Sequence, residues 1–237
     1  MPDPLIHIAG HFKGRFIAEP EALREKLFRI KAYVFDWDGV FNNGMKDESG
    51  ASPFSEVDVM GTNLLRFNHF LRTGETPVTA IITGERNRAA YILARREHFH
   101  SVYYGIRYKA AALQHICRTH GVMPEEVAFV FDDVLDLSVA AICGLRIMVY
   151  RSCNPLLLDF AVQAQLADYI TAVSGNGHAV RETVELLTGI SGLYRETVEH
   201  RMHFTDTYRH YLELRNKAQV AFYTATEPET IIPKVPS

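Results

Sequence analysis

The sequence predicts an α/β fold in which a Rossmann-like parallel sheet is flanked by helices. Short apolar runs rich in β-branched and aromatic residues alternate with longer amphipathic stretches over residues 31–190, which is the pattern of βαβ units. The 237 residues, 47% of them hydrophobic, are enough to bury a sizeable core. We therefore expect one α/β domain over residues 31–190, an N-terminal extension over 1–30, and a C-terminal helical extension and tail over 191–237.

Each element follows from a local signal. The candidate strands are residues 33–35, 78–82, 102–104, 127–131 and 146–149, with a weaker one around Tyr169. The expected helices of the domain are residues 61–72, 87–97, 109–120, 133–143 and 177–188, and a hairpin is expected over residues 45–57. Gly121 and Gly144 end two of these helices.

The two extensions are predicted to be helical. The stretch "EPEALREKLFRI" predicts a helix at the end of the N-terminal extension. In residues 191–222, Phe204, Tyr208, Tyr211 and Leu212 recur at helical spacing, so this helix packs either on its own domain or on another subunit. After Thr224 the proline-rich tail is expected to be mobile.

Composition argues against several classes of partner. With 25 Lys plus Arg and 28 Asp plus Glu, the formal charge is -3, which gives no reason to expect binding to nucleic acid. Cys117, Cys143 and Cys153 are an odd set without CxxC spacing, which favours free thiols and a cytoplasmic protein. The N-terminus has early acid and proline, and no run of eighteen apolar residues occurs, so we expect neither a signal peptide nor a membrane span.

Polar residues follow the predicted strands directly, at the edge of a parallel sheet where ligands bind. Each pattern alone is weak, because such residues also serve as helix caps, turns or solvated side chains. All of them at one edge of one sheet predict a site. These residues are Asp36 and Asp38, Thr83 and Gly84, Lys109, and Asp132 and Asp133.

The ordered set "DWDG", "ITG", a lysine, and "DD" followed by Asp136 resembles the haloacid dehalogenase superfamily of phosphohydrolases. The likeness is closer to the capless KDO 8-phosphate phosphatase group and its sialic-acid-type relatives. It is carried by "FDWDGVFNNG", "AIITG", "EEVAFVFDDVLDLSVAAICGL" and "ADYITAVSGNGHAVRETVELL". It covers roughly residues 32–188 and leaves both extensions unexplained.

The resemblance implies a Mg²⁺-dependent phosphomonoesterase that acts on a small phosphorylated metabolite, such as a nonulosonate-like sugar phosphate. Phosphate monoesters hydrolyse very slowly unaided, so in-line positioning and charge neutralisation supply the catalysis. Asp36 would be the nucleophile that forms an aspartyl-phosphate. Asp38 would act as general acid and base, and Thr83 and Lys109 would hold the phosphoryl oxygens.

A divalent cation is needed because an attacking carboxylate and a phosphate dianion repel one another. By resemblance, the side chains of Asp36 and Asp132 and the backbone carbonyl of Asp38 hold Mg²⁺, which prefers oxygen ligands. Asp133 and Asp136 would orient these ligands or water from nearby.

The sequence departs from the resembling group around the leaving-group pocket. Phe131 replaces a glycine, Asn42 and Asn43 replace Thr-Asp, Glu85 precedes Arg86 where an arginine follows "ITG", and Val59 and Met60 replace charged residues. The phosphoryl-transfer residues are unchanged. A different sugar phosphate, or another small phosphomonoester, is therefore at least as consistent with the sequence as KDO 8-phosphate.

The spacing leaves no room for a cap domain. About 44 residues separate Asp38 from Thr83 and about 25 separate Thr83 from Lys109, against the 50 or more that a domain needs. The site is therefore expected to be open. The resemblance implies that a neighbouring subunit covers it, so we expect a homo-oligomer, with a tetramer favoured.

Other motifs admit plainer interpretations. His98, His100, His200, His203 and His210 lack metal-ligand spacing, which favours capping or solvated roles. The loop "SGNGHAV" is a turn with a helix cap or an anion-binding element. The motif order argues against a receiver domain. A non-catalytic sugar-phosphate sensor or scaffold of the same fold remains the alternative function.

Overall fold

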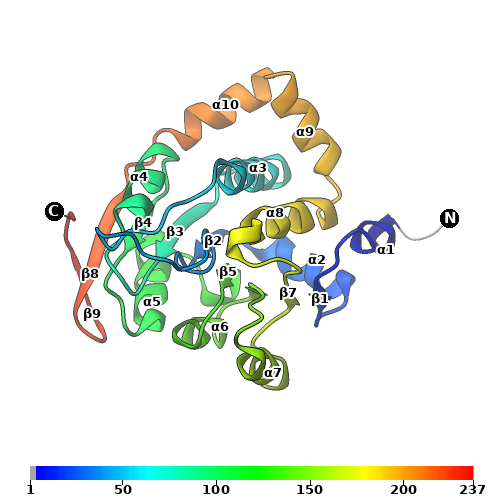
Figure 1. The fold of residues 1–237 in the computed structure, drawn as a ribbon. Helices are drawn as coiled ribbons and strands as arrows, with labels where there is room; N and C mark the ends of the chain where they lie inside the picture. Colours follow the sequence, from blue (N-terminus) through cyan, green and yellow to red (C-terminus); the bar gives the residue numbers. More distant parts are fainter. Residues whose placement is uncertain (1–3, 237) are drawn as a thin grey trace.

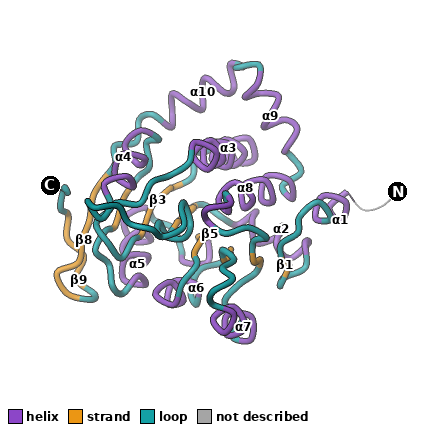
Figure 2. The backbone as a smooth tube through the Cα atoms, viewed as in Figure 1, coloured by secondary structure: helices purple, strands orange, loops and turns teal. Residues whose placement is uncertain are grey.

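The computed structural model describes residues 4–236 and confirms the predicted α/β architecture. Within this range nine strands form one sheet in the order β1-β7-β6-β5-β2-β3-β4-β8-β9 (Figures 1 and 2). Six neighbouring pairs from β7 to β8 are parallel, and the two outermost pairs are antiparallel. The strands are β1 (Arg15–Phe16), β2 (Ala32–Phe35), β3 (Val78–Ile82), β4 (Ser101–Tyr103), β5 (Val127–Phe131), β6 (Leu145–Met148), β7 (Tyr169–Ile170), β8 (Ala221–Glu227) and β9 (Thr230–Pro233).

Helices cover both faces of the sheet. One face packs against α2, α3, α4 and α8, and the other against α5, α6 and α7 (Figure 1). The helices are α1 (Pro4–Ala9), α2 (Pro20–Arg29), α3 (Glu56–Thr73), α4 (Arg88–Arg96), α5 (Lys109–His120), α6 (Leu137–Ala140), α7 (Pro155–Gln163), α8 (Ala179–Ile190), α9 (Tyr194–Met202) and α10 (Asp206–Arg215). No helix in the described part of the chain combines the length and the apolar character needed to cross a bilayer.

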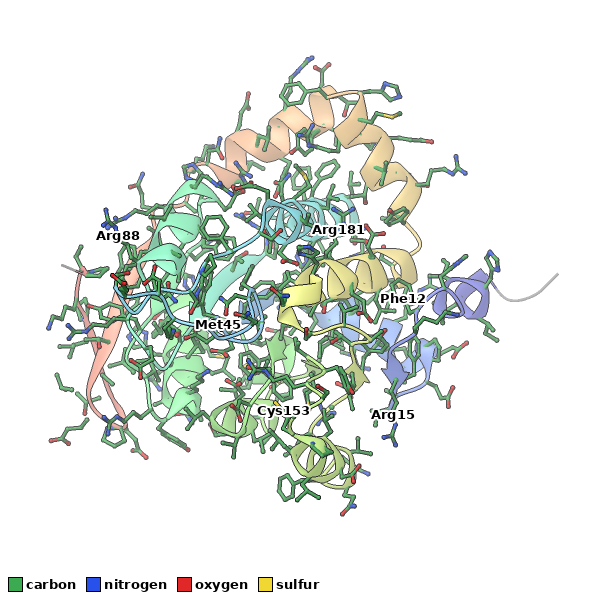
Figure 3. The ribbon with its side chains drawn as sticks, viewed as in Figure 1. Phe12, Arg15, Met45, Arg88, Cys153 and Arg181 are labelled. Atoms are coloured by element: carbon green, nitrogen blue, oxygen red, sulfur yellow. The ribbon has the colours of Figure 1, made fainter. Side chains whose placement is uncertain are left out.

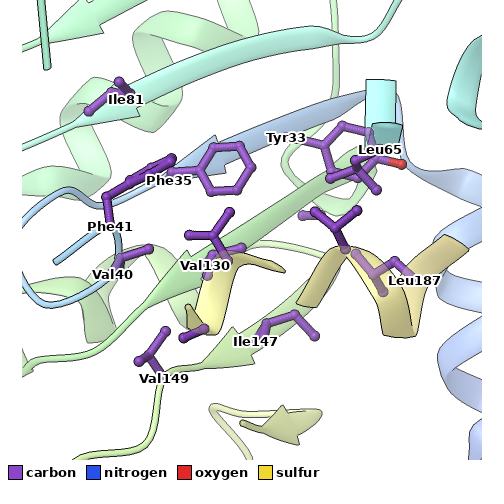
Figure 4. Packing of buried hydrophobic residues seen from close by; sticks show 14 of the residues in the cluster. Tyr33, Phe35, Val40, Phe41, Leu65, Ile81, Val130, Ile147, Val149 and Leu187 are labelled. Atoms are coloured by element: carbon purple, nitrogen blue, oxygen red, sulfur yellow. The ribbon is translucent and has the colours of Figure 1, made fainter. Parts of the chain in front are cut away.

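The central strand β2 is buried along its whole length between β3 and β5. Phe35 lies in register with Ile81 on one side and Val130 on the other. Tyr33 and Phe35 point into the core cluster beneath α3 and α8, and Val34 points into the cluster on the opposite face (Figure 4). A strand buried on both faces must be apolar at every position, which explains why "AYVF" shows no polar alternation.

Local caps fix the helix boundaries. α3 begins five residues before the predicted start because the Ser55 hydroxyl accepts the Val57 N–H as an N-cap. It ends at Gly74, whose φ is 77°. α5 spans the predicted range and ends at Gly121, whose φ is 65°.

The predicted hairpin of paired strands over residues 45–57 is absent: residues 45–55 form a loop, and residues 56 and 57 begin α3. The chain turns once, where the Asp47 N–H donates to the Ala51 carbonyl (2.9 Å) and the Asp47 carboxylate accepts from Ser49 and Ala51. A polar stretch that hydrogen-bonds to itself in this way has no apolar alternation to pair with a second strand. We call residues 41–55 the flap loop below.

Two further helices differ from the prediction. Residues 155–163 form α7, which was not predicted although Pro155 at its first turn is a helix-start signal. The helix predicted over residues 133–143 is a 3₁₀ turn, η2 (Val134–Asp136), followed by the four-residue α6. Asp133 and Asp136 organise that turn, as the site geometry below shows.

The N-terminal extension joins the sheet. α2 confirms the predicted helix, and β1 pairs antiparallel with β7. The buried Asp168 accepts from Lys26 of α2 (2.6 Å) and from the Arg146 backbone N–H (2.9 Å). This carboxylate therefore ties α2 to the edge of the sheet.

The predicted helix over residues 191–222 is broken into α9 and α10. The chain turns at Phe204, whose φ is 47°. Tyr208 and Tyr211 pack against Phe67 and Phe70 of α3, which forms a third layer outside α3 (Figure 1). Of the two alternatives for this segment, packing on its own domain is thus observed, and a subunit contact stays a prediction.

The prediction that the tail after Thr224 is mobile is wrong. β8 pairs parallel with β4, and β9 folds back antiparallel on β8. Phe222 is buried against the Tyr91 ring (5.7 Å between centroids) with the Arg95 guanidinium over it. Both faces of this strand pack into the core, because Val220 and Phe222 face one apolar cluster and Tyr223 and Ala225 face the other, and this burial outweighs the disorder expected from the later prolines.

Candidate active site

The predicted site residues lie at the carboxyl ends of the central parallel strands. Asp36 follows β2 and Asp132 follows β5, and these strands pair directly. The Asp36 N–H donates to the Val130 carbonyl (2.9 Å), which extends the pairing to the aspartate itself. Thr83 follows β3 on the other side of β2, and Lys109 is the first residue of α5.

Three buried carboxylates converge at this edge. One oxygen each of Asp36, Asp132 and Asp136 lies within 4.8 Å of the others. Lys109 Nζ bridges Asp36 Oδ1 and Asp136 Oδ1 at 2.6 Å each. We call Asp36, Asp132 and Asp136 the acidic triad. The three carboxyl groups outnumber their two neighbouring cations, Lys109 and Arg151, so the triad can accept a further cation.

Burial and mutual repulsion raise the pKa values of Asp36 and Asp132. Burial raises the pKa of Asp36 to about 7, and the Asp136 carboxylate adds to the rise against the opposing effect of Lys109. Burial and the Asp36 charge raise the pKa of Asp132 to about 9, although Arg151 opposes this. Burial alone would lower the pKa of Lys109, but the two carboxylates together raise it. The lysine therefore stays charged, while Asp36 and Asp132 bind protons more readily than usual, and a bound cation would displace those protons.

Asp132 offers the buried oxygen ligands that a cation site needs. Both of its carboxylate oxygens are buried, and neither accepts a hydrogen bond from the residues that the structure describes. Arg151 Nε lies 2.6 Å from Oδ2, an ion pair in which no N–H is aligned for a hydrogen bond. Buried carboxylate oxygens that accept no hydrogen bond lower the stability of the protein unless a ligand binds to them. An all-oxygen group of this kind fits a hard divalent metal ion.

The glycine of "DWDG" lets the chain pass close to the triad. Gly39 has a φ of 89°, and a Cβ there would lie 2.0 Å from Asp132 Oδ2 and 2.3 Å from Arg151 Nη2. Both the backbone conformation and the space therefore require glycine.

Asp38 lies at the mouth of the site. Its carboxylate accepts from the Ser52 hydroxyl (2.6 Å) and from Lys46 Nζ, both on the flap loop. The side chain is 24% exposed, against 7% for Asp36. Asp38 is thus more exposed to solvent than the buried triad.

Thr83 and Gly84 border the same edge. Thr83 is fully buried, and its Oγ1 accepts the Glu85 N–H (3.3 Å), which leaves the hydroxyl hydrogen for a ligand. A Cβ on Gly84 would meet nothing closer than the Ile106 carbonyl at 3.7 Å. Packing does not require this glycine.

The two acids after Asp132 have different positions. Asp136 Oδ2 accepts the backbone N–H of Asp133 (3.1 Å) and that of Asp132 (3.4 Å), which folds the strand-end loop back on itself. Asp133 caps η2 by accepting from Val134 (2.7 Å). Asp136, predicted to act from nearby, is therefore a member of the triad, and Asp133 lies outside it.

The replaced residues of the pocket are spread over several places. Phe131 is fully buried in the core, where it stacks on Phe129 at 5.4 Å, so its ring does not narrow the site. Asn42 organises the turn after β2 by accepting from Gly44 (2.8 Å). Met60 lines a cavity beneath the C-terminal helices and not the active site.

The loop "SGNGHAV" packs against the first motif. It forms a 3₁₀ turn, η3 (Gly175–Gly177), and a Cβ on Gly175 would lie 2.1 Å from the Asn42 carbonyl and 2.3 Å from the Gly39 carbonyl. A cavity of ≈ 370 Å³ opens between this loop and the flap loop. Its lining residues are Phe41, Asn42, Asn43, Met45, Pro53, Phe54, Ser55, Gly175, Asn176 and His178.

Three neighbours of the site were not predicted. Lys46 and Ser52 belong to a loop with no motif, so no sequence signal identifies them. Arg151 differs, because it follows β6, and the rule that ligands bind at the carboxyl ends of strands applies to this strand as well. Figure 3 labels its neighbour Cys153, and Met45 of the flap loop.

Comparisons with known proteins agree with this geometry. No family model matches the chain. The 3-deoxy-D-manno-octulosonate 8-phosphate phosphatase of Yersinia pestis is 29% identical over 170 residues, which cover 69% of this chain and 82% of the relative. Its counterpart from Escherichia coli K12 is 28% identical over 166 residues, which cover 68% and 81%.

Solved structures show the same likeness. A structure described as a HAD-superfamily hydrolase (subfamily III A) from Legionella pneumophila has a TM-score of 0.64 and 28% identity, covering 77% of this chain and 95% of that one. The Yersinia pestis phosphatase structure has a TM-score of 0.60 and 27% identity, covering 73% and 88%. With the parallel sheet and the ordered acidic residues at its strand ends, these likenesses show a phosphoric monoester hydrolase that is similar to the KDO 8-phosphate phosphatase group of the haloacid dehalogenase superfamily.

Proposed function

We propose that this protein is a Mg²⁺-dependent phosphomonoesterase that acts on a small sugar phosphate through an aspartyl-phosphate on Asp36. The observation that carries the proposal is the acidic triad, bridged by Lys109 at the carboxyl ends of β2 and β5. The names of the curated relatives support an acidic sugar phosphate related to 3-deoxy-octulosonate 8-phosphate as substrate, a class that includes the nonulosonate-like phosphates.

Asp36 is placed to attack phosphorus. Its Oδ1 is fixed by Lys109, and its position at the end of a fully paired strand leaves it little freedom to move. Such fixing lowers the entropy lost on reaching the in-line geometry. Lys109 and the Thr83 hydroxyl hold the phosphoryl oxygens, on which charge must be stabilised during transfer.

Asp38 transfers the protons. It donates a proton to the leaving oxygen of the sugar and then removes one from the water that cleaves the aspartyl-phosphate. Ser52 and Lys46 hold its carboxylate toward the mouth of the site, on the side where a leaving group would lie.

Asp36, Asp132 and the Asp38 backbone carbonyl would hold Mg²⁺, with Asp136 beside them and Asp133 at the rim. The bound ion supplies charge neutralisation between the attacking carboxylate and the phosphate. The two buried carboxylate oxygens of Asp132, which accept no hydrogen bond from the described residues, support this assignment.

The open site favours assembly. No separate cap domain lies over the triad in the described chain, whose insert between β2 and α3 is the flap loop. We infer that a second subunit shields the site in a homo-oligomer, a tetramer by resemblance to the group. Light scattering of the purified protein tests this, and a monomer at micromolar concentration would contradict it.

The activity test is direct. The purified protein is incubated with p-nitrophenyl phosphate between pH 5 and 9, with Mg²⁺ and then with excess EDTA. We expect hydrolysis that EDTA abolishes, and a higher kcat/KM for acidic sugar phosphates in a substrate panel. Absence of hydrolysis under all conditions, with tight binding of a sugar phosphate, would instead support a non-catalytic sensor.

A further inference from the structure

Arg151 is a second cation beside the triad, and it is held differently from Lys109. Lys109 is buried and donates hydrogen bonds to two carboxylates, Asp36 and Asp136. Arg151 has a side chain that is 25% exposed, and its contact with Asp132 is an ion pair without a hydrogen bond. Of the two cations, Arg151 is therefore the one that can leave at low cost.

A cavity lies beside the Arg151 guanidinium and has room to receive it. Its Nη2 contacts the Asn43 carbonyl at 3.4 Å, across the turn that follows β2. Beside it lies a cavity of ≈ 180 Å³ that opens to solvent, between this turn and the loop after β6 (Figure 3, where Met45 and Cys153 mark the two segments). Its lining includes Asn42, Asn43, Ser152 and Ser174, whose oxygens can accept the guanidinium N–H groups.

We propose that Arg151 is a displaceable internal counter-ion of Asp132, which pairs with one carboxylate oxygen when no divalent cation is bound and moves into the adjoining cavity when a cation binds. The inference rests on the proposed function in that the cation is the catalytic Mg²⁺. It assigns to Arg151 a positioning and regulatory role: this residue sets the affinity of the metal site.

The charges predict the direction in which Mg²⁺ affinity changes when Arg151 is removed. A positive guanidinium next to Asp132 repels any other cation that approaches the same carboxylate. A divalent ion feels about twice the repulsion that a proton feels, because the interaction scales with charge. Removing Arg151 therefore favours Mg²⁺ binding more than it favours protonation of Asp132, and the metal affinity rises.

The test compares Arg151→Gln, Arg151→Lys and the control Arg88→Gln. Arg88 is an exposed arginine at the start of α4 (labelled in Figure 3) with no ion pair among the described residues. Mg²⁺ binding to metal-free protein is measured by titration calorimetry and by fluorescence of Trp37, which directly follows Asp36 and is the one tryptophan of the chain.

We expect the Mg²⁺ Kd of Arg151→Gln to be at least about fivefold lower than that of the wild type, because one repelling charge is lost. Arg151→Lys should lie between the two, and Arg88→Gln should match the wild type. The melting temperature of Arg151→Gln should be lower without Mg²⁺ and should rise more when Mg²⁺ is added.

Two results overturn the inference. An Arg151→Gln Kd equal to or higher than that of the wild type would show that Arg151 does not compete with the cation. If Arg151→Gln does not fold, the Arg151→Lys Kd decides in the same way. A wild type that binds no Mg²⁺ would overturn the proposed metal dependence together with this inference, whereas wild-type binding with unchanged variants overturns this inference alone.

Discussion

Two lysine–aspartate pairs lie within one active site and differ in their surroundings. Lys109 and Asp36 have side chains only 4% and 7% exposed, and they are fixed at the ends of paired elements. Lys46 and Asp38 are 32% and 24% exposed, and Lys46 belongs to a loop. In the proposed mechanism the buried pair serves the phosphoryl group, which is common to all substrates. The exposed pair serves the leaving group, which varies, so the proposal concentrates rigidity where the chemistry is constant.

The largest effect is expected from Asp36→Asn, which keeps the shape of the side chain but removes the nucleophile. We expect kcat to fall by more than about 10³-fold, because no other residue at the strand end can form the covalent intermediate. Steady-state hydrolysis of p-nitrophenyl phosphate measures this. A rate close to that of the wild type would mean that water attacks directly and Asp36 has another role.

Lys109→Met and Lys46→Met test the comparison through stability. Lys109→Met leaves Asp36 and Asp136 without their buried counter-ion, so we expect a loss of about 3–5 kcal/mol in unfolding free energy. Lys46→Met removes an exposed pair, so the expected loss is about 0–1 kcal/mol. Urea unfolding without metal at pH 7 compares them. Similar losses in both variants would remove the distinction between the centre and the rim.

The pH dependence of metal-free stability comes next. The pKa of Asp132 is raised from 3.8 to about 9 in the folded protein. Between these values the folded state binds more protons than the unfolded chain, so the contribution of Asp132 to stability falls as pH rises from about 4 to 9. Urea unfolding in EDTA at pH 5 and 8 should show a smaller decline for Asp132→Asn than for the wild type. Equal declines would contradict the raised pKa.

Lys46→Met should have the smallest effect on catalysis. Lys46 orients Asp38, which protonates a poor leaving group such as a sugar alkoxide but is not needed for nitrophenolate. We expect kcat/KM to fall a few fold, about 3–10-fold, for a sugar phosphate and to change little for p-nitrophenyl phosphate. Equal losses for the two substrates would show that Lys46 acts on the phosphoryl group instead.

The same contrast explains what the sequence could predict. Strand β2 and Asp36 are encoded locally, by an apolar run that ends in an acid, and β5 with Asp132 repeats this signal. The triad's third member, Asp136, was placed only by resemblance, because its position depends on how the loop after β5 folds back on its own N–H groups.

The rim could not be predicted in this way. Lys46 meets Asp38 through a turn that Asp47 stabilises, and such a turn has no periodicity. Arg151 depends on the pairing of β6 with β5, which brings two distant segments together. β8 was missed because the later prolines dominated the interpretation, although Phe222 had the apolar signal of a buried strand.

The pairing of β8 with β4 affects how the protein folds during its synthesis. Tyr104 donates its hydroxyl hydrogen to the carbonyl of Lys234, a partner 130 residues further along the chain. During synthesis the outer edge of β4 stays unpaired until nearly all of that intervening chain has left the ribosome. An unpaired edge beside the catalytic strands invites association with other nascent chains. Shortening the chain before residue 221 should therefore lower the soluble yield far more than it lowers the activity of the molecules that do fold.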